Sequence, residues 1–416
     1  MSAVALPPKF DVFDPALLDD PYPTYARLRE AGALCRAGPA TWAVTRHAEV
    51  TALLRDPRLG HGVPDGLGRP ALLPGREPYG DVVERVLGAA RPNAELPGLV
   101  SALDPPAHPR VRGLLARALN PAAVRRLTGL AARTAGDLLD GVGDGPLDAV
   151  GDFALPLQTR VACDMLGVPA ADRDEVAALA AELGRAIILI PFVTPERGNG
   201  EPEARRLKAY ARGLIAERRA RPGPDLVSRM LAVRQGADSL SDEEVADNAV
   251  FLFFAGFETT VHLVGGGALE LAGNPGQYAR LRADRSLIPS AVEELLRYDP
   301  PLQWISRTTA EPVEIEGRTL RPGRFLLLLL ASANRDERAF AAPDRLDVGR
   351  RPNPHLGFGG GAHHCLGVLL ARAVGAAALG ALVSRAAAIE PAGEPVRRRH
   401  PNVRGLISAP LSLRPA

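Results

Sequence analysis

The spacing of apolar and polar positions changes along the chain and separates a long helical part from a smaller β-type part. From Arg110 onward, apolar residues recur at helical spacing for about 160 residues, interrupted at Gly- and Pro-rich points. Before that, the pattern predicts a short helix over Pro23–Ala31 and a strand over Thr41–Thr45. We therefore expect a mainly α fold with a small β region.

After Pro300 the pattern changes to short strands. β-type or continuously apolar runs occur at 313–315, 319–320 and 325–330, with Gly-containing turns between them, which predicts a small sheet. Residues 403–413 are expected to add a hairpin. The sequence shows no internal repeat and no linker composition, so residues 1–416 are predicted to form a single domain.

The composition is that of an ordinary globular protein. Hydrophobic residues make up 46% of the 416 positions and charged residues 24%, and 50 Lys and Arg nearly balance 48 Asp and Glu. The net charge of +2 argues against a dedicated nucleic-acid-binding protein. Since the only lysines are Lys9 and Lys208, nearly every cation is a guanidinium, for which codon bias is the simplest explanation.

Cysteine usage and the lack of targeting patterns bear on location. Three cysteines, Cys35, Cys163 and Cys365, make no disulfide framework and fit a reducing compartment. The first ten residues lack a signal-peptide pattern, and no apolar run reaches the ~18 residues that a membrane span needs. We expect a cytoplasmic protein without a membrane anchor, in which Cys35 and Cys163 are small buried apolar residues.

One glycine-rich loop carries the strongest candidate chemistry. Residues 358–367 run Phe-Gly-Gly-Gly-Ala-His-His-Cys-Leu-Gly and lead directly into an Ala-, Leu- and Val-rich helical pattern. Exposed N–H groups and the helix dipole favour a thiolate at such a helix start, and glycines let the backbone approach a flat ligand. The sulfur is then a nucleophile or a metal ligand, with a buried helix-capping cysteine as the alternative.

Two other cysteine chemistries fit this loop poorly. Zinc is disfavoured because the adjacent residues His363, His364 and Cys365 cannot easily fill three tetrahedral positions, and no second ligand pair appears. A cysteine protease is disfavoured because no nucleophile motif with an evident oxyanion hole is present.

The loop resembles the haem-binding signature of the cytochrome P450 family. The matching residues are Phe358, Gly359, Gly361, His363, Cys365 and Gly367. The resemblance implies an α-rich triangular prism that encloses haem b (iron protoporphyrin IX). Cys365 would be the iron ligand, whose electron donation favours O–O cleavage, and the other matching residues would help to bind the cofactor.

A long helix is predicted upstream of this loop. Ser241 and Glu244 form a capping-box pattern and Asn274-Pro275 supplies a stop, which gives about 33 residues and about 50 Å. Glu258 and Thr259 then place an acid and a hydroxyl in a buried apolar stretch. A Thr back-bond and a solvent-facing Glu at a kink are the alternative explanation.

The same stretch resembles the acid–alcohol pair in the central helix of the P450 family. By that resemblance, Ala255 and Gly256 lie at the cofactor, and Gly256 leaves room for dioxygen. Thr259 would hydrogen-bond the bound oxygen, and Glu258 would help to relay protons to it.

A carboxylate and a guanidinium form a further motif of the family. Glu294 and Arg297 lie three residues apart on one predicted helix face, where they can pair. By resemblance, Arg345 of the Pro-x-Arg segment 343–345 completes a structural triad that braces the cysteine loop.

Segment 104–112 resembles the family's stretch that holds the haem propionates. His108 and Arg112 match its two donors, and Arg pairs well with a carboxylate. Because Pro109 follows His108, we expect His108 to be extended or in a turn. Arg307 and His363 are the other propionate donors that the resemblance implies.

Together these resemblances imply a haem-thiolate monooxygenase that inserts one oxygen atom from O₂ into a small organic molecule. The electrons are expected from a separate ferredoxin and its reductase, and the protein is expected to be a monomer. Arg110, Arg350 and Arg351 flank the motifs around the cysteine and are either part of a docking face or ordinary solvated residues. Two alternatives stay open: a haem-thiolate enzyme that uses peroxide or couples, nitrates or rearranges its substrate, and a non-catalytic haem-binding sensor.

The substrate is expected to be a moderately large, mostly apolar metabolite such as a polyketide or terpenoid. The Gly- and Pro-rich segment 60–98 is predicted to be a long functional loop that contributes to the pocket. The other candidate pocket residues are Ile188, Phe254, Leu302, Trp304, Ile305 and Leu406. Aliphatic residues dominate this set, as they do in any core. The Trp304 N–H either orients a polar group of the substrate or simply packs.

Overall fold

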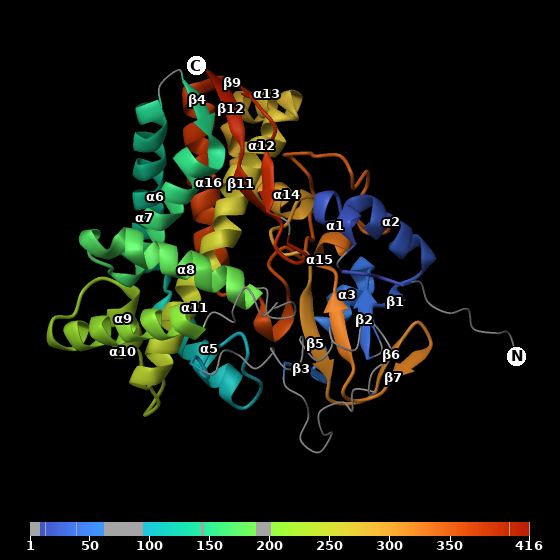
Figure 1. The fold of residues 1–416 in the computed structure, drawn as a ribbon, viewed down its shortest axis with the longest axis horizontal. Coiled ribbons are helices and arrows are strands. Elements are labelled where there is room, and N and C mark those ends of the chain that lie inside the picture. The colour runs from blue at the N-terminus through green and yellow to red at the C-terminus, as the bar shows by residue number, and fades with distance from the viewer. Residues whose placement is uncertain are drawn as a thin grey trace, which may run out of the picture.

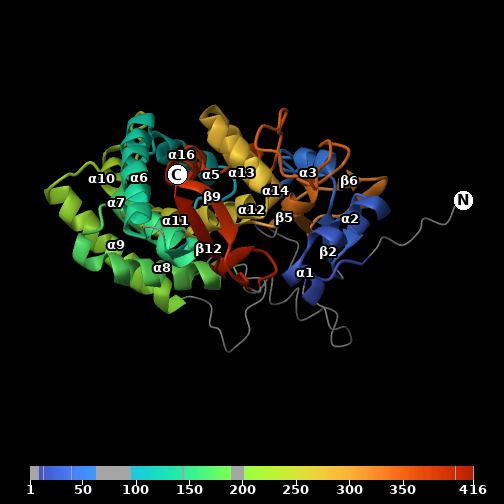
Figure 2. The ribbon, with the colours of Figure 1, turned by 90° about the horizontal axis from the view of Figure 1, so that it is seen from above.

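A helical region and a β-rich region lie side by side in the protein (Figure 1). The computed structural model describes residues 9–12, 14–38, 40–61, 95–142, 145–188, 201–398 and 400–415. Most of the predicted loop 60–98 lies outside these residues. Seen from above, the helices of the middle of the chain fill one half and the N-terminal elements the other (Figure 2).

The helical region confirms the predicted helical part of the sequence. Its helices are α5 (Ala107–Ala118), α6 (Pro121–Val142), α7 (Leu155–Leu166), α8 (Arg173–Ile188), α9 (Glu201–Ala220), α10 (Leu226–Ala232), α11 (Asp242–Val261), α12 (Gly267–Ala272), α13 (Pro275–Ala283), α14 (Ile288–Tyr298) and α16 (Val368–Arg385). The breaks follow the sequence signals. For example, α7 ends at Gly167, whose φ of 78° lies in the left-handed region that glycine tolerates.

The β-rich region is built on a five-stranded sheet in the order β1-β2-β8-β5-β3. Its elements are β1 (Leu34–Arg36), β2 (Thr41–Val44), β3 (Leu59–Gly60), β5 (Ile305–Thr309) and β8 (Phe325–Leu328), with α1 (Pro15–Asp19), α2 (Tyr22–Ala31), α3 (His47–Leu53) and α15 (Leu330–Ala333) around them. β2 and β8 pair in parallel, whereas the other neighbours are antiparallel. All four residues of β8 are buried, because it is the middle strand.

Three smaller sheets complete the structure. β6 (Val313–Ile315) and β7 (Arg318–Leu320) form a two-stranded sheet, and the third strand predicted with them, β8, belongs to the five-stranded sheet instead. β10 (Val396–Arg398) pairs with β11 (Gly405–Ser408), and β12 (Pro410–Pro415) pairs with β4 (Pro146–Asp148) and β9 (Ala386–Pro391). The predicted hairpin over 403–413 is therefore wrong. Ala409, between β11 and β12, is hydrogen-bonded to Asp148 and Ala149, which directs the two strands to different partners.

The predicted central helix is present, but it contains a π-helical turn. α11 begins with the predicted capping box between Ser241 and Glu244, and the run continues through a π turn at His262–Gly266 into α12. A second π turn, Ala149–Ala154, packs against the first. A Cβ on Gly265 would lie 3.2 Å from the Ala149 carbonyl oxygen, so this contact requires a residue without a side chain.

Two described helices are long and apolar enough, by length and composition, to cross a membrane: the run Asp242–Ala272 and α16. The expectation from sequence rested only on uninterrupted apolar runs. These two helices are apolar on average over 18 residues, although isolated polar residues interrupt them. In the most apolar window, 67% of the first helix and 44% of the second is buried inside the protein. Buried core helices have the same composition, so this is weak evidence for a membrane span.

The core is divided into several buried apolar clusters. One joins α6 and α7 to α14 and α16, and another joins α5 and α8–α10 to α11. Cys163 lies in the second of these clusters, and Cys35 lies in a cluster of the β-rich region. Both cysteines are fully buried, as predicted.

Candidate active site

The glycine-rich loop places Cys365 directly before α16, as predicted. The Cys365 N–H donates to the carbonyl of Phe358 at 3.0 Å, which closes the loop on itself. Gly359 and Gly361 have φ of 66° and 65°, values that favour glycine. A Cβ on Gly361 would also lie 2.0 Å from the carbonyl oxygen of Leu54. The loop conformation and its approach to the end of α3 therefore require glycine at these positions.

The environment of Cys365 suits a metal ligand better than a free nucleophile. Burial raises the pKa of its thiol, while the Gly367 N–H and the guanidiniums of Arg112 and Arg372 favour the thiolate. The N–H at the helix start thus acts in the expected direction, although desolvation has the larger effect on the pKa of this thiol. A metal ion bound to the sulfur would remove the thiol proton outright.

His108 lies in the first turn of helix α5, so the expectation that it is extended or in a turn conformation is wrong. Pro109 occupies the third helical position, where the missing N–H would have had no helical acceptor. His108 and Arg112 therefore lie one turn apart on the same helix face. Arg112 donates to the carbonyl oxygen of His364, next to Cys365.

Three imidazoles gather beside the cysteine loop. The rings of His108 and His363 are stacked with centroids 3.9 Å apart, and the ring of His61 lies 4.2 Å from that of His363. Arg307 donates from Nη1 to Nε2 of His61 at 3.0 Å. The structure thus brings together the predicted residues His108, His363 and Arg307 and adds His61. No motif in the sequence pointed to His61.

This cluster is rich in hydrogen-bond donors and fits the propionate end of a haem. Burial and the neighbouring His61, His108 and Arg307 lower the pKa of His363 to about 2. Burial lowers the pKa of Arg307 to about 10. In the described part of the chain, the buried Nε2 of His108 has no hydrogen-bond partner. Two carboxylates among these groups would accept their hydrogen bonds and balance their charge.

A metal site is the competing interpretation of the same cluster. His61, Asp104 and His363 each offer a ligand atom, and these atoms lie within 4.8 Å of one another. However, Nδ1 of His61 is 3.4 Å from Asp104, and its Nε2 accepts from Arg307. A guanidinium at this position repels a cation, so the geometry favours an anionic group.

The residues predicted to face dioxygen lie on α11. Thr259 donates from Oγ1 to the carbonyl of Ala255 at 2.9 Å, which is the back-bond that the sequence allowed. Gln158 on α7 donates to the carbonyl of Gly256 at 3.1 Å. Among the described residues, a Cβ on Gly256 would meet only the Gln158 amide, at 3.9 Å. Gly256 therefore leaves open space beside the helix.

Glu258 is largely shielded from solvent, with 12% of its side chain exposed. It lies against α8, where a Cβ on Gly184 would be 4.0 Å from its Cγ. Arg398 of β10 forms an ion pair with it, with 3.7 Å between Nη2 and Oε1. The alternative of a solvent-exposed acid at a kink is thus wrong.

The buried brace behind the cysteine loop has a different third member from the one predicted. Glu294 and Arg297 are fully buried and joined by two hydrogen bonds of 2.7 and 2.9 Å. The second guanidinium at Glu294 belongs to Arg350, at 3.0 Å. Arg345 contributes only its carbonyl, which accepts from Arg297 and Arg350. The Arg345 side chain itself is exposed.

Comparison with known proteins decides which family has this architecture. The family model for cytochrome P450 matches residues 185–411, more than half of the chain. The vitamin D(3) 25-hydroxylase of Pseudonocardia autotrophica is 35% identical, over 97% of this chain and 96% of that protein. This chain belongs to the cytochrome P450 family.

Other relatives agree with this assignment. A putative cytochrome P450 126 of Mycobacterium tuberculosis is 36% identical over 89% of this chain and 87% of its own length. Among solved structures, the P450 PksS of the Bacillus subtilis bacillaene polyketide synthase has a TM-score of 0.84 at 29% identity, covering 97% of this chain and all of that one. The protein is therefore a P450 monooxygenase with the P450 fold, and the cofactor of the family is haem b.

A second acidic residue of α14 supports the cysteine loop of this P450. Glu293 accepts hydrogen bonds from His355 at 3.0 Å and from Arg372 of α16 at 2.7 Å. Burial raises the pKa of Glu293, but these hydrogen bonds outweigh it and lower the pKa to about 2. No pattern in the sequence predicts this group of three residues, because they are far apart in the chain.

Two of the three arginines considered for partner docking are engaged within the P450 itself. Arg110 forms ion pairs with Asp238, at 3.1 Å, and with Glu244. Arg350 belongs to the buried brace. Arg351 is exposed and stays a candidate for a docking face.

The residues predicted for the substrate pocket lie in different parts of the P450. Trp304 is 2% exposed and packs with Phe10, Leu17 and Tyr25, and its indole N–H donates to the carbonyl of Pro401 at 3.3 Å. This favours the packing alternative for Trp304. The remaining candidates are Phe254 and Leu406, which are buried in separate clusters, and Leu302 and Ile305, which are partly buried. Ile188 ends α8, and its side chain lies outside the described part of the structure.

Proposed function

We propose that this P450 oxidises a moderately large, mostly apolar metabolite of polyketide or terpenoid type. The balanced reaction is R–H + O₂ + 2 H⁺ + 2 e⁻ → R–OH + H₂O, with electrons from a separate ferredoxin and its reductase. Relatives of similar fold support this substrate class: a vitamin D(3) 25-hydroxylase, a P450 of a polyketide synthase, and CYP109E1 in complex with testosterone. We further propose that the protein is a cytoplasmic monomer.

In this proposal Cys365 is the iron ligand, and the donor cluster holds the propionates through His108, Arg112, Arg307 and His363. Haem bound between the cysteine loop and α11 supplies the reduction of dioxygen and the transfer of one oxygen atom to the substrate. The residues that shape its two faces are Phe358, Gly359 and Gly367 in the loop, and Ala255 and Gly256 in α11. The observation that carries the proposal is that one structure combines the Cys365 loop, the cluster of hydrogen-bond donors beside it and the acid–alcohol pair Glu258 and Thr259 on α11.

Glu258 and Thr259 deliver protons in this proposal. The Glu258 carboxylate is largely shielded from bulk water, and in this role it accepts a proton from nearby water and passes it toward the pocket. The Thr259 hydroxyl, bonded to the Ala255 carbonyl, can rotate to donate into the open space beside Gly256. A peroxide-using enzyme would need no such pair.

The test is the absorption spectrum of the dithionite-reduced protein with and without CO. We expect a strongly red-shifted Soret band, the mark of a thiolate opposite CO. Apolar metabolites are then screened by the spin-state change that they induce, and binders are assayed with NADPH, ferredoxin and its reductase. Turnover with peroxide alone would favour the peroxygenase alternative, and normal haem ligation without turnover by any redox partner would favour a sensor.

A further inference from the structure

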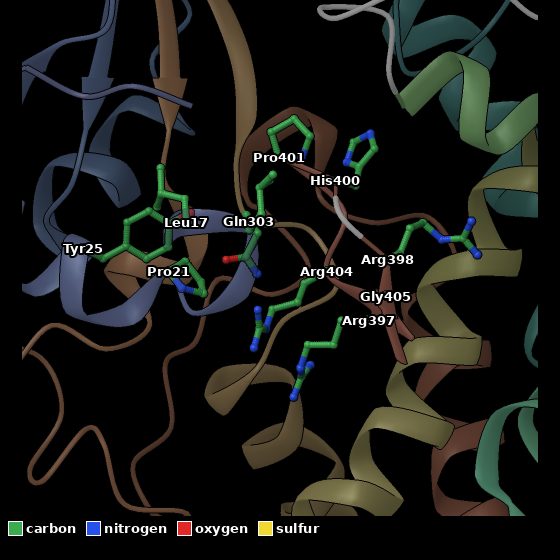
Figure 3. Close-up of a pocket in the computed structure, with 11 residues that line it drawn as sticks. Leu17, Pro21, Tyr25, Gln303, Arg397, Arg398, His400, Pro401, Arg404 and Gly405 are labelled. Carbon is green, nitrogen blue, oxygen red and sulfur yellow. The ribbon is translucent and has the colours of Figure 1, made fainter. Parts of the chain in front are cut away.

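Strand β10 carries two adjacent arginines that leave it in different directions (Figure 3). Successive side chains of a strand point to opposite faces, so the two guanidiniums reach different neighbours. Arg397 lies 4.0 Å from Glu270 on α12 and 3.9 Å from Asp299. Arg398 points toward the central helix, where Glu258 lies 3.7 Å away.

Arg398 is the one ion-pair partner of Glu258 within the described part of the chain. The side chains are 25% and 12% exposed, respectively, so the pair sits at the boundary between solvent and the interior. A separation of 3.7 Å is longer than a hydrogen bond. The carboxylate is therefore attracted to the guanidinium but is not fixed by a hydrogen bond to it.

The chemistry of arginine limits what Arg398 can do. A guanidinium stays protonated in proteins and accepts no hydrogen bond, so it does not pass a proton by titrating. It acts through its charge, and the attraction is stronger at a partly shielded site than on an open surface. The effect of Arg398 on the reaction must therefore pass through the Glu258 carboxylate that it attracts.

We propose that Arg398 is a positioning residue for proton delivery in this P450. It holds the Glu258 carboxylate in the wall between α11 and β10, where the carboxylate takes up protons from water and passes them toward Thr259. This inference rests on the proposed role of Glu258. It assigns a function to the C-terminal strand β10, which lies about 140 residues from the acid–alcohol pair in the sequence.

The experiment uses the holoenzyme with ferredoxin and its reductase, and dioxygen is the probe, with no organic substrate added. Two outcomes compete: O₂ + 2 e⁻ + 2 H⁺ → H₂O₂, and O₂ + 4 e⁻ + 4 H⁺ → 2 H₂O. The second needs further proton delivery, so the peroxide formed per O₂ consumed reports on it. We expect Arg398→Gln to raise the peroxide fraction several-fold and Arg398→Lys to restore most of the parent value, because Lys keeps the charge.

Arg397→Gln is the matched control, since it removes the same charge from the same strand but leaves the ion pair of Glu258 intact. Its peroxide fraction should stay at the parent value. The reduced-CO spectrum and the melting temperature of each variant show whether the fold and the haem site are preserved. A crystal structure of the Arg398→Gln holoenzyme should show the Glu258 carboxylate displaced.

Variants of Glu258 separate failure of this inference from failure of the proposed function. If Glu258→Gln leaves the peroxide fraction unchanged, the relay itself is wrong. If Glu258→Gln raises it but Arg398→Gln does not, or if Arg397→Gln raises it equally, the role of Arg398 is overturned. The double variant Glu258→Gln/Arg398→Gln should match Glu258→Gln alone, because Arg398 acts only through that carboxylate. An additive effect would contradict the proposal.

Discussion

The two sides of the candidate active site are built in different ways. Behind the cysteine loop, Glu294 is fully buried and accepts from both Arg297 and Arg350 at 3.0 Å or less. On α11, Glu258 is held by one ion pair of 3.7 Å to a partly exposed guanidinium. A redundant buried network fixes geometry, whereas a single long ion pair permits movement. We therefore expect the side that carries Cys365 to be the more rigid of the two, and the side that carries Glu258 to be the more flexible.

Replacing the metal ligand on the rigid side should have the largest effect. Cys365→Ser is expected to abolish thiolate ligation, because the variant has no sulfur and a serine hydroxyl is much harder to deprotonate than a thiol. The reduced-CO spectrum should lose its strong red shift, while the folded fraction stays similar. Cys35→Ala, in the core of the β-rich region, serves as the control and should keep the shift. An unchanged band in Cys365→Ser would remove the basis of the site assignment.

Removing an arginine from the buried brace at Glu294 should have the next largest effect on the protein. The same experiment tests whether Arg350 or Arg345 is the third member of the brace. Arg350→Met removes one partner of a fully buried carboxylate, for which a loss of ~3–5 kcal/mol is typical. The expected result is a lower melting temperature and faster loss of haem. Arg345→Met is the matched control, and it should differ little from the parent because the Arg345 side chain is exposed. Equal losses in the two variants would restore Arg345 as the third member.

On the flexible side, Thr259→Ala should keep the haem but waste electrons. The substitution removes the hydroxyl next to the open space beside Gly256, so more of the consumed oxygen should leave as peroxide. Product and peroxide formed per NADPH are the measurement. Thr259→Ser retains a hydroxyl and should stay closer to the parent. A Thr259→Ala variant as well coupled as the parent would show that the relay assignment is wrong.

The smallest effect expected is a pH dependence of stability on the rigid side. The folded pKa of Glu293, about 2, lies below its ordinary value of 4.5. Its contribution is therefore complete above the ordinary value and is lost as the pH falls toward the folded one. In Glu293→Gln, the fall in stability between pH ~5 and ~3 should shrink by about 1–2 kcal/mol, reduced for partial exposure.

The Glu293 prediction is tested by measuring the melting temperatures of the parent and of Glu293→Gln between pH ~5 and ~3. Glu314→Gln, which replaces an exposed carboxylate of β6, should leave the pH dependence as in the parent. If Glu293→Gln and the parent lose stability in parallel, Glu293 does not support the cysteine loop through its charge.

The sequence predicted the local features of the site better than the contacts between distant segments, for a physical reason. The cysteine loop and the Ser241 cap depend on residues within a few positions of one another, and their conformation follows from local chemistry. Arg345 and Arg350 are only five positions apart, and which one reaches Glu294 depends on how the intervening turn directs each side chain. His61 and Arg398 join the site from distant segments, and only the tertiary fold brings them there.

The π turn at His262–Gly266 has a consequence for how the central helix is used. A π turn holds one residue more than an α turn, so it rotates everything after it by about a quarter of a turn relative to a regular helix. Glu258 and Thr259 lie before the turn, while Ala268 and Leu271 beyond it lie in the core shared with α14 and α16. The extra residue thereby lets one continuous helix place these two sets of side chains on faces that a regular helical period would not align.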